Sequence, residues 1–160
     1  MENRESSLNH LGVNIDGNRR YAEKKVILKF KGNEEGAQKV EDFLKWCEEL
    51  DIKETTIYCL STENLKRDKE ELNHLFGLFK KWFKKFSDNN KIHEKKVRIK
   101  FIGDLSLVPE DIRNLALELE KKTKNYDNYR LNFCFAYGGR LELLKAVNKI
   151  HKEKKQNEEI

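Results

Sequence analysis

The chain has 160 residues, a length that fits one domain with a substantial core and is short for two. Hydrophobic and charged residues each make up 38% of the sequence. No apolar run approaches the roughly 18 residues that a membrane-spanning helix needs. The N-terminus lacks an apolar signal-peptide core, so we expect a cytoplasmic protein. The net charge of +5 favours anionic partners, although 33 basic residues are interleaved with 28 acidic ones.

The three cysteines give no sign of a metal site or of disulfides. Cys47, Cys59 and Cys134 are scattered within apolar stretches and lack paired metal-ligand spacing. We therefore expect buried free thiols, as is typical of proteins in a reducing compartment.

In chain order, short strand-like runs alternate with longer segments of helical periodicity. The sequence predicts a strand over 11–15, a helix over 34–50, a strand over 55–60, a helix from 69 to about 86, a strand over 97–103, a helix opened by Pro109, a strand over 130–137 and a helix over 141–150. The run 97–103 alternates apolar and basic residues, which places it near one edge of the sheet. Residues 151–160 are predicted to be a solvated tail or a frayed helix end.

This alternation is typical of an α/β fold, in which helices cover a parallel sheet and the crossovers are right-handed. We expect a parallel sheet with helices on both faces. The sequence contains no internal repeat or low-complexity linker. Residues 1–160 are therefore predicted to form one domain, with an N-terminal tail over about 1–9 and a C-terminal tail over 151–160.

Polar clusters follow each of the four predicted strands. Because the carboxyl ends of parallel strands meet at one edge of a sheet, the clusters are expected to share a single ligand-binding rim. In chain order they are Asp16-Gly17-Asn18-Arg19-Arg20, Ser61-Thr62-Glu63-Asn64 with Arg67 just beyond, Gly103-Asp104, and Tyr137-Gly138-Gly139-Arg140.

The residue types in these clusters suit a metal-bound phosphate. Asp16 supplies a hard oxygen ligand for magnesium, which commonly binds one or two carboxylates together with substrate phosphates. Gly17 lets the backbone approach a ligand closely. Arginine side chains can donate charge-assisted hydrogen bonds to a diphosphate. Asn64 offers both a donor and an acceptor that could orient a substrate group.

Each cluster also has a purely structural interpretation. Asp, Gly and Asn all favour turns, so DGN alone is more often a turn than a metal site. The stretch STEN alone is more often a helix cap. YGGR can simply close a strand-to-helix turn, which is at least as good an explanation as a direct ligand role. The common rim is what favours a binding site.

Four stretches then match a known family in their order along the chain: HLGVNIDGNRRYAEKK, IYCLSTENLKR, IKFIGD and LNFCFAYGGRLELLKAVNKI. They resemble signatures of the cis-prenyltransferases, the Z-type isoprenyl diphosphate synthases. The resemblance runs from His10 to about Ile150, and DGNRR, STEN and YGGR at these separations form a specific combination. It implies an undecaprenyl diphosphate synthase-like fold, which we expect to be incomplete at its C-terminal end.

The resemblance also implies a reaction and a magnesium cofactor. The double bond of isopentenyl diphosphate would attack an allylic carbon as diphosphate leaves, giving a Z-polyprenyl diphosphate. Asp16 would act in catalysis and hold magnesium, and Asn64 matches an asparagine implicated in proton removal. The implied substrate-binding residues are Gly17, Asn18, Arg19, Arg20, Tyr21, Ser61, Thr62, Glu63 and Arg67. The aromatic-rich helix 72–86 matches a wall of the family's hydrophobic tunnel.

The chain departs from the family pattern at two further substrate-binding positions. Lys29 stands where the family usually has arginine, so the charge is kept and the bidentate fork is lost. Asn33 replaces a histidine and cannot act as a titrating acid or base. Near the STEN cluster, Leu65 replaces an aromatic residue and Asp68 replaces a common proline.

Family enzymes continue into a segment with an RxSGExRxS-like motif that binds isopentenyl diphosphate, and no equivalent is present here. The resemblance therefore implies a homo- or hetero-oligomer in which another chain supplies the C-terminal half, with peripheral membrane association. Without that half, we expect a marginally stable chain, because a parallel sheet deprived of strands exposes apolar surface. The alternative is a non-catalytic prenyl diphosphate-binding or partner subunit. A nucleic-acid-binding domain is not expected, since no recognition motif supports it.

Overall fold

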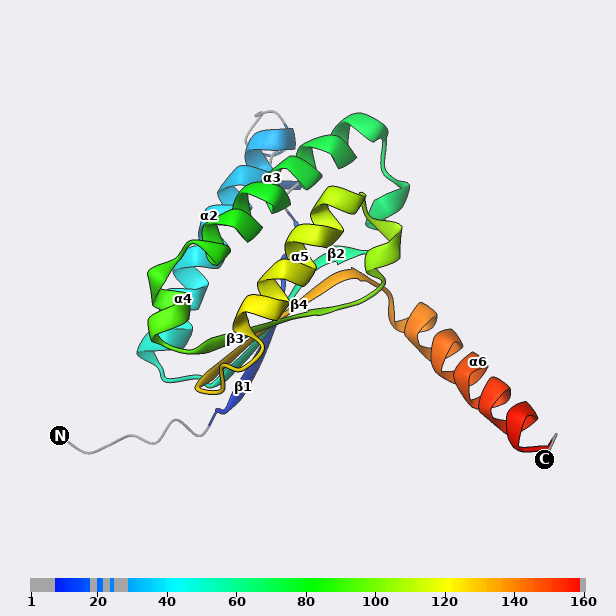
Figure 1. The fold of residues 1–160 in the computed structure, drawn as a ribbon. Helices are drawn as coiled ribbons and strands as arrows, with labels where there is room; N and C mark the ends of the chain where they lie inside the picture. The colour runs from blue at the N-terminus through cyan, green and yellow to red at the C-terminus, as the bar shows by residue number, and fades with distance from the viewer. Residues whose placement is uncertain (1–7, 18–19, 22–23, 25–28, 159–160) are drawn as a thin grey trace.

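Four parallel strands form one sheet in the computed structural model, which describes residues 8–17, 20–21, 24 and 29–158 (Figure 1). The strands are β1 (His10–Asn14), β2 (Glu54–Ser61), β3 (Val97–Ile102) and β4 (Tyr129–Tyr137), in the spatial order β1-β2-β4-β3. All neighbouring pairs are parallel. The predicted α/β class is confirmed, and β3 occupies an edge of the sheet as its alternating sequence indicates.

Three long helices cover one face of this sheet. They are α2 (Lys29–Glu49), α3 (Lys69–Ser87) and α5 (Glu110–Thr123), with the short α4 (Asn90–Glu94) following α3 (Figure 1). Asp68 caps α3 by accepting a hydrogen bond from the Glu71 amide, and Pro109 precedes the first turn of α5. Helix α2 begins five residues before its predicted start, since GNEEG is helical. At five residues, α4 is too short to produce a periodic pattern in the sequence.

An aromatic cluster fills the space between this helix layer and the sheet. The ring of Phe83 on α3 lies 4.8 Å from that of Phe101 and 5.4 Å from that of Phe135, centroid to centroid. Phe79 packs edge-on against Phe135 at 4.7 Å, and Phe133 stacks on Phe101 at 5.4 Å. Such offset and edge-on arrangements are the favourable ones for aromatic pairs. The cluster is the centre of the hydrophobic core.

The second face of the sheet carries a cluster of hydrogen-bonded polar side chains near the amino ends of the strands. Asn132 donates hydrogen bonds to Glu54 Oε1 (2.8 Å) and Thr56 Oγ1 (3.1 Å), and the His10 ring lies 2.8 Å from the same Thr56 hydroxyl. The expected helix layer on this face is not formed by the described residues. The last helix, α6 (Gly139–Glu158), instead leaves the carboxyl end of β4 and projects away from the sheet (Figure 1).

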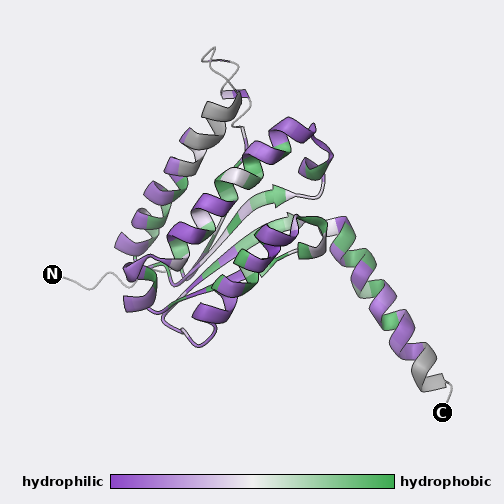
Figure 2. Cartoon of the chain, turned by 45° about the horizontal axis from the view of Figure 1, so that its top comes forward, coloured by the Kyte–Doolittle hydropathy of each residue, from purple (hydrophilic) through white to green (hydrophobic). Residues whose placement is uncertain are grey.

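Helix α6 extends through the predicted tail and carries apolar side chains in solvent. Leu143, Leu144, Val147 and Ile150 are each about 60–70% exposed, and Figure 2 shows hydrophobic segments along this projecting helix. No helix in the described part of the chain is both long and apolar enough to cross a bilayer. Among the described residues, none covers these four apolar side chains of α6.

The outer edge of β3 is closed by side chains of α5. The Ile99 amide donates to Thr123 Oγ1 (3.0 Å), and the Phe101 amide donates to Glu120 Oε1 (2.6 Å). Thr123 is fully buried and also donates its hydroxyl to the Leu119 carbonyl (2.9 Å). Two backbone donors of an edge strand are thus satisfied by a helix, which blocks pairing with another strand along this edge.

Replacing Thr123 with valine should destabilise the fold. The Thr123→Val side chain keeps the shape but leaves the buried Ile99 amide without an acceptor, which costs about 1–3 kcal/mol. Urea unfolding would measure the loss, with Thr123→Ser as the control because serine retains the hydroxyl. Equal stability of the valine and serine variants would contradict the proposed role of this bond.

Candidate functional site

The described residues of the four polar clusters lie at one edge of the sheet, as predicted. Because every strand is parallel, the segments that follow β1, β2, β3 and β4 all emerge from the carboxyl edge. The strand order places the turn after β2 between the loop after β1 and the turn after β4. The segment Gly103-Asp104 lies on the far side of β4, next to the start of α6, where Asp104 pairs with Lys145.

The loop after β1 is organised around Asp16. Gly17 adopts a φ of +94°, a conformation that favours glycine, and its amide donates to Asp16 Oδ1 (2.6 Å). Arg20 Nη2 donates to Asp16 Oδ2 (2.8 Å), and both side chains are about 70% exposed. The predicted ligands Asn18 and Arg19 lie outside the described residues. The loop thus presents a carboxylate and a guanidinium together, open to solvent.

Other predicted ligands lie at the start of the helix layer. Tyr21 is exposed, and a hydrogen bond to the Glu35 carboxylate raises the pKa of its hydroxyl, which connects this turn to α2. Lys29 and Asn33 belong to the first turns of α2, but their side chains lie outside the part of the chain that can be described. Their predicted contacts with a substrate remain predictions.

The turn after β2 is held by a reciprocal pair of hydrogen bonds. The Ser61 amide donates to Asn64 Oδ1 (3.0 Å), and the Asn64 amide donates to Ser61 Oγ (3.1 Å). These bonds hold the side-chain amide of Asn64 with its oxygen engaged in the turn. The side-chain NH₂ group is therefore the part available to a ligand. Hydrogen bonds from its own backbone and from Ser61 lower the pKa of Glu63, so this carboxylate is ionised at neutral pH.

Arg67 is oriented by a partner that the sequence interpretation missed. Its Nη1 donates to Glu71 Oε1 (2.8 Å), and the Glu71 side chain is only 5% exposed. Arginine and glutamate four residues apart at the start of a helix commonly form an ion pair, so this spacing could have identified Glu71 as the partner. The remaining guanidinium donors of Arg67 are the ones available to an anion at the rim.

The residues at the rim fit magnesium that is bound together with a diphosphate. Among the described residues, no group of three His, Cys, Asp or Glu side chains could hold a metal by itself. Magnesium does not require such a group, since it is commonly held by one or two carboxylates and completes its octahedral shell with phosphate oxygens and water. Asp16 is exposed and can serve as that carboxylate.

A cavity of about 570 Å³ lies at the opposite edge of the sheet, between α2, α3, α4 and the amino ends of the strands. Its wall includes Trp82 and Phe86 from the aromatic helix and Leu131 from β4. Ion pairs Glu41–Lys85 and Glu48–Lys95 connect α2 to the segments beside it. The sequence pattern could not reveal this cavity, because its lining comes from elements far apart in the chain.

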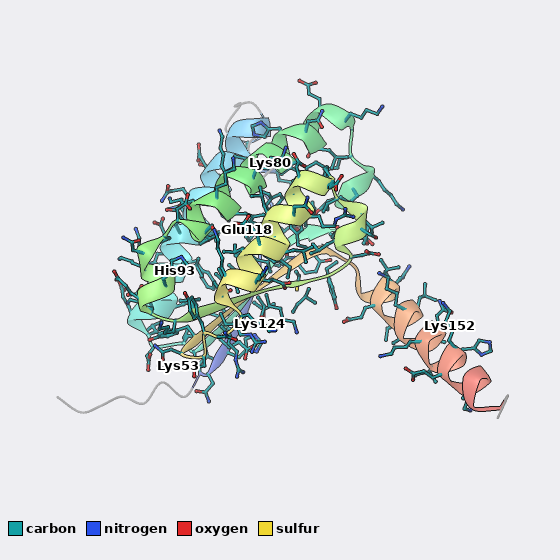
Figure 3. All side chains as sticks on the ribbon, in the orientation of Figure 1. Lys53, Lys80, His93, Glu118, Lys124 and Lys152 are labelled. Carbon is teal, nitrogen blue, oxygen red and sulfur yellow. The ribbon has the colours of Figure 1, made fainter. Side chains whose placement is uncertain are left out.

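The cysteines and a surface ion pair outside the rim have structural roles. Burial raises the pKa of the thiols of Cys47 and Cys59, so both favour the protonated form and are unsuited to nucleophilic chemistry. Lys80 pairs with Asp111 and joins α3 to α5 on the outer surface (Figure 3). The buried-thiol prediction holds for Cys47 and Cys134, whereas Cys59 is half-buried.

Comparison with known proteins identifies the family. A protein-family model described as "Putative undecaprenyl diphosphate synthase" matches residues 15–160. The chain belongs to the undecaprenyl diphosphate synthase family. The matched region includes the loop after β1, the turn after β2 and the turn after β4, which confirms the resemblance drawn from the sequence motifs.

Curated relatives carry the same type of name. The chain is 45% identical over 141 residues to the tritrans,polycis-undecaprenyl-diphosphate synthase (geranylgeranyl-diphosphate specific) of Haloarcula marismortui, covering 88% of this chain and 46% of that protein. It is 43% identical over 141 residues to the protein of the same name from Methanopyrus kandleri, covering 88% and 52%. The chain thus spans about half the length of the curated relatives that it matches.

Solved structures confirm the fold. A lavandulyl diphosphate synthase from Lavandula x intermedia, determined in complex with dimethylallyl diphosphate, aligns with a TM-score of 0.86 at 24% identity, covering 96% of this chain and 65% of that one. A probable undecaprenyl diphosphate synthase from Campylobacter jejuni aligns with a TM-score of 0.72 at 29% identity, covering 92% and 63%. The predicted undecaprenyl diphosphate synthase-like architecture is therefore correct.

Removing the charge of Glu71 should loosen Arg67 and destabilise the start of α3. In Glu71→Gln the buried partner of a half-buried guanidinium is neutral, so we expect a loss of about 1–3 kcal/mol in unfolding free energy. Glu70→Gln is the matched control, because Glu70 is exposed in the same helical turn. Chemical denaturation would compare the two, and equal stability would show that the Arg67–Glu71 pair contributes little.

Proposed function

We propose that this chain binds an allylic prenyl diphosphate with magnesium and forms the allylic half of a Z-polyprenyl diphosphate synthase. The observation that carries the proposal is the shared rim, where Asp16, Arg20 and the Ser61–Asn64 turn lie on neighbouring strand ends. The names of the curated relatives support the same chemistry. The reaction is the condensation of isopentenyl diphosphate onto the allylic carbon.

Arg20 and Arg67 have the chemistry to hold the diphosphate. Asp16 and Arg20 now satisfy each other, so binding would exchange this ion pair for a carboxylate–metal contact and a guanidinium–phosphate contact. Magnesium, when bound, neutralises charge on the departing diphosphate. Arg67 is held by Glu71 and can donate its free N–H groups to the same anion. These donors stabilise the charge that develops as the allylic carbon–oxygen bond breaks.

Asn64 and the neighbouring turn would orient the reacting groups. The Asn64 side-chain oxygen is engaged by the Ser61 amide, so its NH₂ group is left to donate to a substrate oxygen. In this arrangement Asn64 positions the diphosphate or its leaving oxygen. The reciprocal bonds to Ser61 keep that amide from rotating freely, which is the preorganisation that catalysis requires.

The cavity at the amino edge would accept the far end of a long prenyl tail. It is lined by Trp82, Phe86, Leu131 and Leu44, among others, and such apolar walls favour a hydrocarbon ligand. Each CH₂ group that it removes from water contributes up to about 0.8 kcal/mol. The tail cavity and the diphosphate rim lie at opposite edges of the same sheet, which suits a ligand that is polar at one end only.

We further propose that the isopentenyl diphosphate site comes from polypeptide equivalent to the part of the relatives that this chain does not match. Exposed apolar residues on α6 and the unpaired edge of β1 give such a segment surfaces on which to pack. A homo- or hetero-oligomer with a second chain is the arrangement that the proposal favours. The alternative is a subunit that binds prenyl diphosphate without turnover.

An isopentenyl transfer assay separates these possibilities. Radiolabelled isopentenyl diphosphate, an allylic diphosphate and magnesium would be supplied to the purified chain, alone and with proteins encoded beside it. We expect labelled polyprenyl product only in a mixture. Product from the chain alone would overturn the second-chain requirement. Tight allylic diphosphate binding with no product in any mixture would favour the non-catalytic subunit.

Asp16→Asn should abolish the magnesium dependence of diphosphate binding. Calorimetric titration with dimethylallyl diphosphate would be run with magnesium and with EDTA. We expect the variant to bind at least about tenfold more weakly in magnesium, equivalent to about 1.4 kcal/mol. In EDTA it should bind at least as tightly as the wild type, because Arg20 is released from Asp16. Asp127→Asn is the control, because Asp127 is exposed before β4 at the other edge of the sheet. Unchanged magnesium-dependent binding in Asp16→Asn would refute the metal role.

Filling the cavity should weaken only long-tailed ligands. Leu44 lines the cavity from α2, so Leu44→Trp places additional volume inside it. We expect the affinity for geranylgeranyl diphosphate to fall at least about tenfold, while that for dimethylallyl diphosphate stays within about twofold. Leu117→Trp, at an exposed position of α5, is the matched control. An equal loss for both ligands would place the tail elsewhere.

A further inference from the structure

The turn after β4 makes close backbone contact with the turn after β2. The Tyr137 carbonyl accepts two hydrogen bonds from β2 and its turn, one from the Thr62 amide (2.9 Å) and one from the Tyr58 hydroxyl (3.1 Å). The Tyr58 and Tyr137 rings also meet edge-on, with centroids 5.7 Å apart. One carbonyl thus holds the turn that contains Ser61, Thr62 and Asn64.

Gly138 completes this contact because there is no room for a side chain. A Cβ atom on Gly138 would lie 2.5 Å from Thr62 Oγ1 and 3.3 Å from Thr62 Cγ2. The backbone of Gly138 does not have a positive φ, so an L-residue meets no conformational barrier there. Among the described residues, the side chain of Thr62 is what leaves no room for a Cβ atom at this position.

The adjacent glycine provides a contrast within the same motif. A Cβ atom on Gly139 would meet nothing within 4 Å, and Gly139 also has no positive φ. The two glycines of YGGR are consecutive and share the start of α6. The contact with Thr62 is present at Gly138 and absent at Gly139.

We propose that Gly138, together with the Tyr137 carbonyl, positions the Ser61–Asn64 turn of the diphosphate site. This inference rests on the proposed function for the identity of the ligand, but the contact itself does not depend on it. Gly138 is a positioning residue, since it acts through Thr62. YGGR thereby acquires a role that is neither a diphosphate ligand nor a simple chain reversal.

The effect would travel through a short series of contacts. Pushing Thr62 away from Gly138 strains the hydrogen bond that the Thr62 amide donates to the Tyr137 carbonyl. Because Thr62 follows Ser61 directly, the displacement also moves Ser61. The Ser61 amide and hydroxyl are the two groups that hold Asn64. Thr62 could avoid the clash by turning its hydroxyl aside, but it would then lose the hydrogen bond that lowers the pKa of Glu63. Either response disturbs the turn.

Four variants of the chain would test this inference. Gly138→Ala should make the Thr62 and Asn64 amides exchange hydrogen about tenfold faster and weaken magnesium-dependent binding of dimethylallyl diphosphate about tenfold. Gly139→Ala should leave both measurements within about twofold of the wild type. Thr62→Ala removes Oγ1 and Cγ2, so Gly138→Ala combined with Thr62→Ala should return to the values of Thr62→Ala alone.

The rescue separates positioning from general destabilisation. If Gly138→Ala merely unfolds the chain, removing the Thr62 side chain would not restore exchange protection to residues 61–64, and the inference would fail. The inference would also fail if the Thr62 and Asn64 amides exchange hydrogen at the same rate in Gly138→Ala and in Gly139→Ala. If the wild type binds no allylic diphosphate, the proposed function fails. The exchange measurement would then still report whether Gly138 holds the turn.

Discussion

The central place of β4 is the constraint on which the rest of the structure depends. β4 pairs with β2 on one side and β3 on the other, so its nine residues fix the level at which both neighbours end. Its inward side chains Leu131, Phe133 and Phe135 form the floor of the helix layer, and its last carbonyls hold the turns of the rim. A shift of β4 along its axis would disturb the core and the site together.

Close backbone approach is how the rim is built around this strand. Gly103 has a φ of +145°, and a Cβ atom there would lie 2.0 Å from the Phe135 carbonyl, while Gly138 fits against Thr62. β2 carries a register shift near Leu60, and Ala136 has a φ of +50° at the end of β4. Irregular backbone at Gly17, Gly103 and Ala136 thus accompanies the polar clusters, while Asp51 and Lys96 have positive φ at the opposite edge of the sheet.

The sequence allowed the strands, the three covering helices and the common rim to be predicted, because each depends on local periodicity and on the geometry of parallel strands. Partners such as Glu71 for Arg67 could have been found by helix spacing. The cavity and the Gly138–Thr62 contact could not, since they join residues distant in the chain and depend on atomic spacing. The uncovered second face was also unexpected, because its Asn132–Glu54–Thr56 hydrogen bonds leave no local periodic signal.

Under the proposed function, the distance between the rim and the cavity limits which ligands can reach both. At about 3.3 Å per residue, β4 spans roughly 30 Å, so a molecule that reaches both ends must be long, slender and apolar beyond its head. Phe133 and Phe135 pack against Phe83 along that line, and their mutual contacts leave little freedom there. By contrast, α2 is tied across the cavity by Glu41–Lys85 and Glu48–Lys95, which are partly exposed ion pairs of modest strength. The side of the cavity that α2 forms is therefore the one that can move outward at the smallest cost in packing.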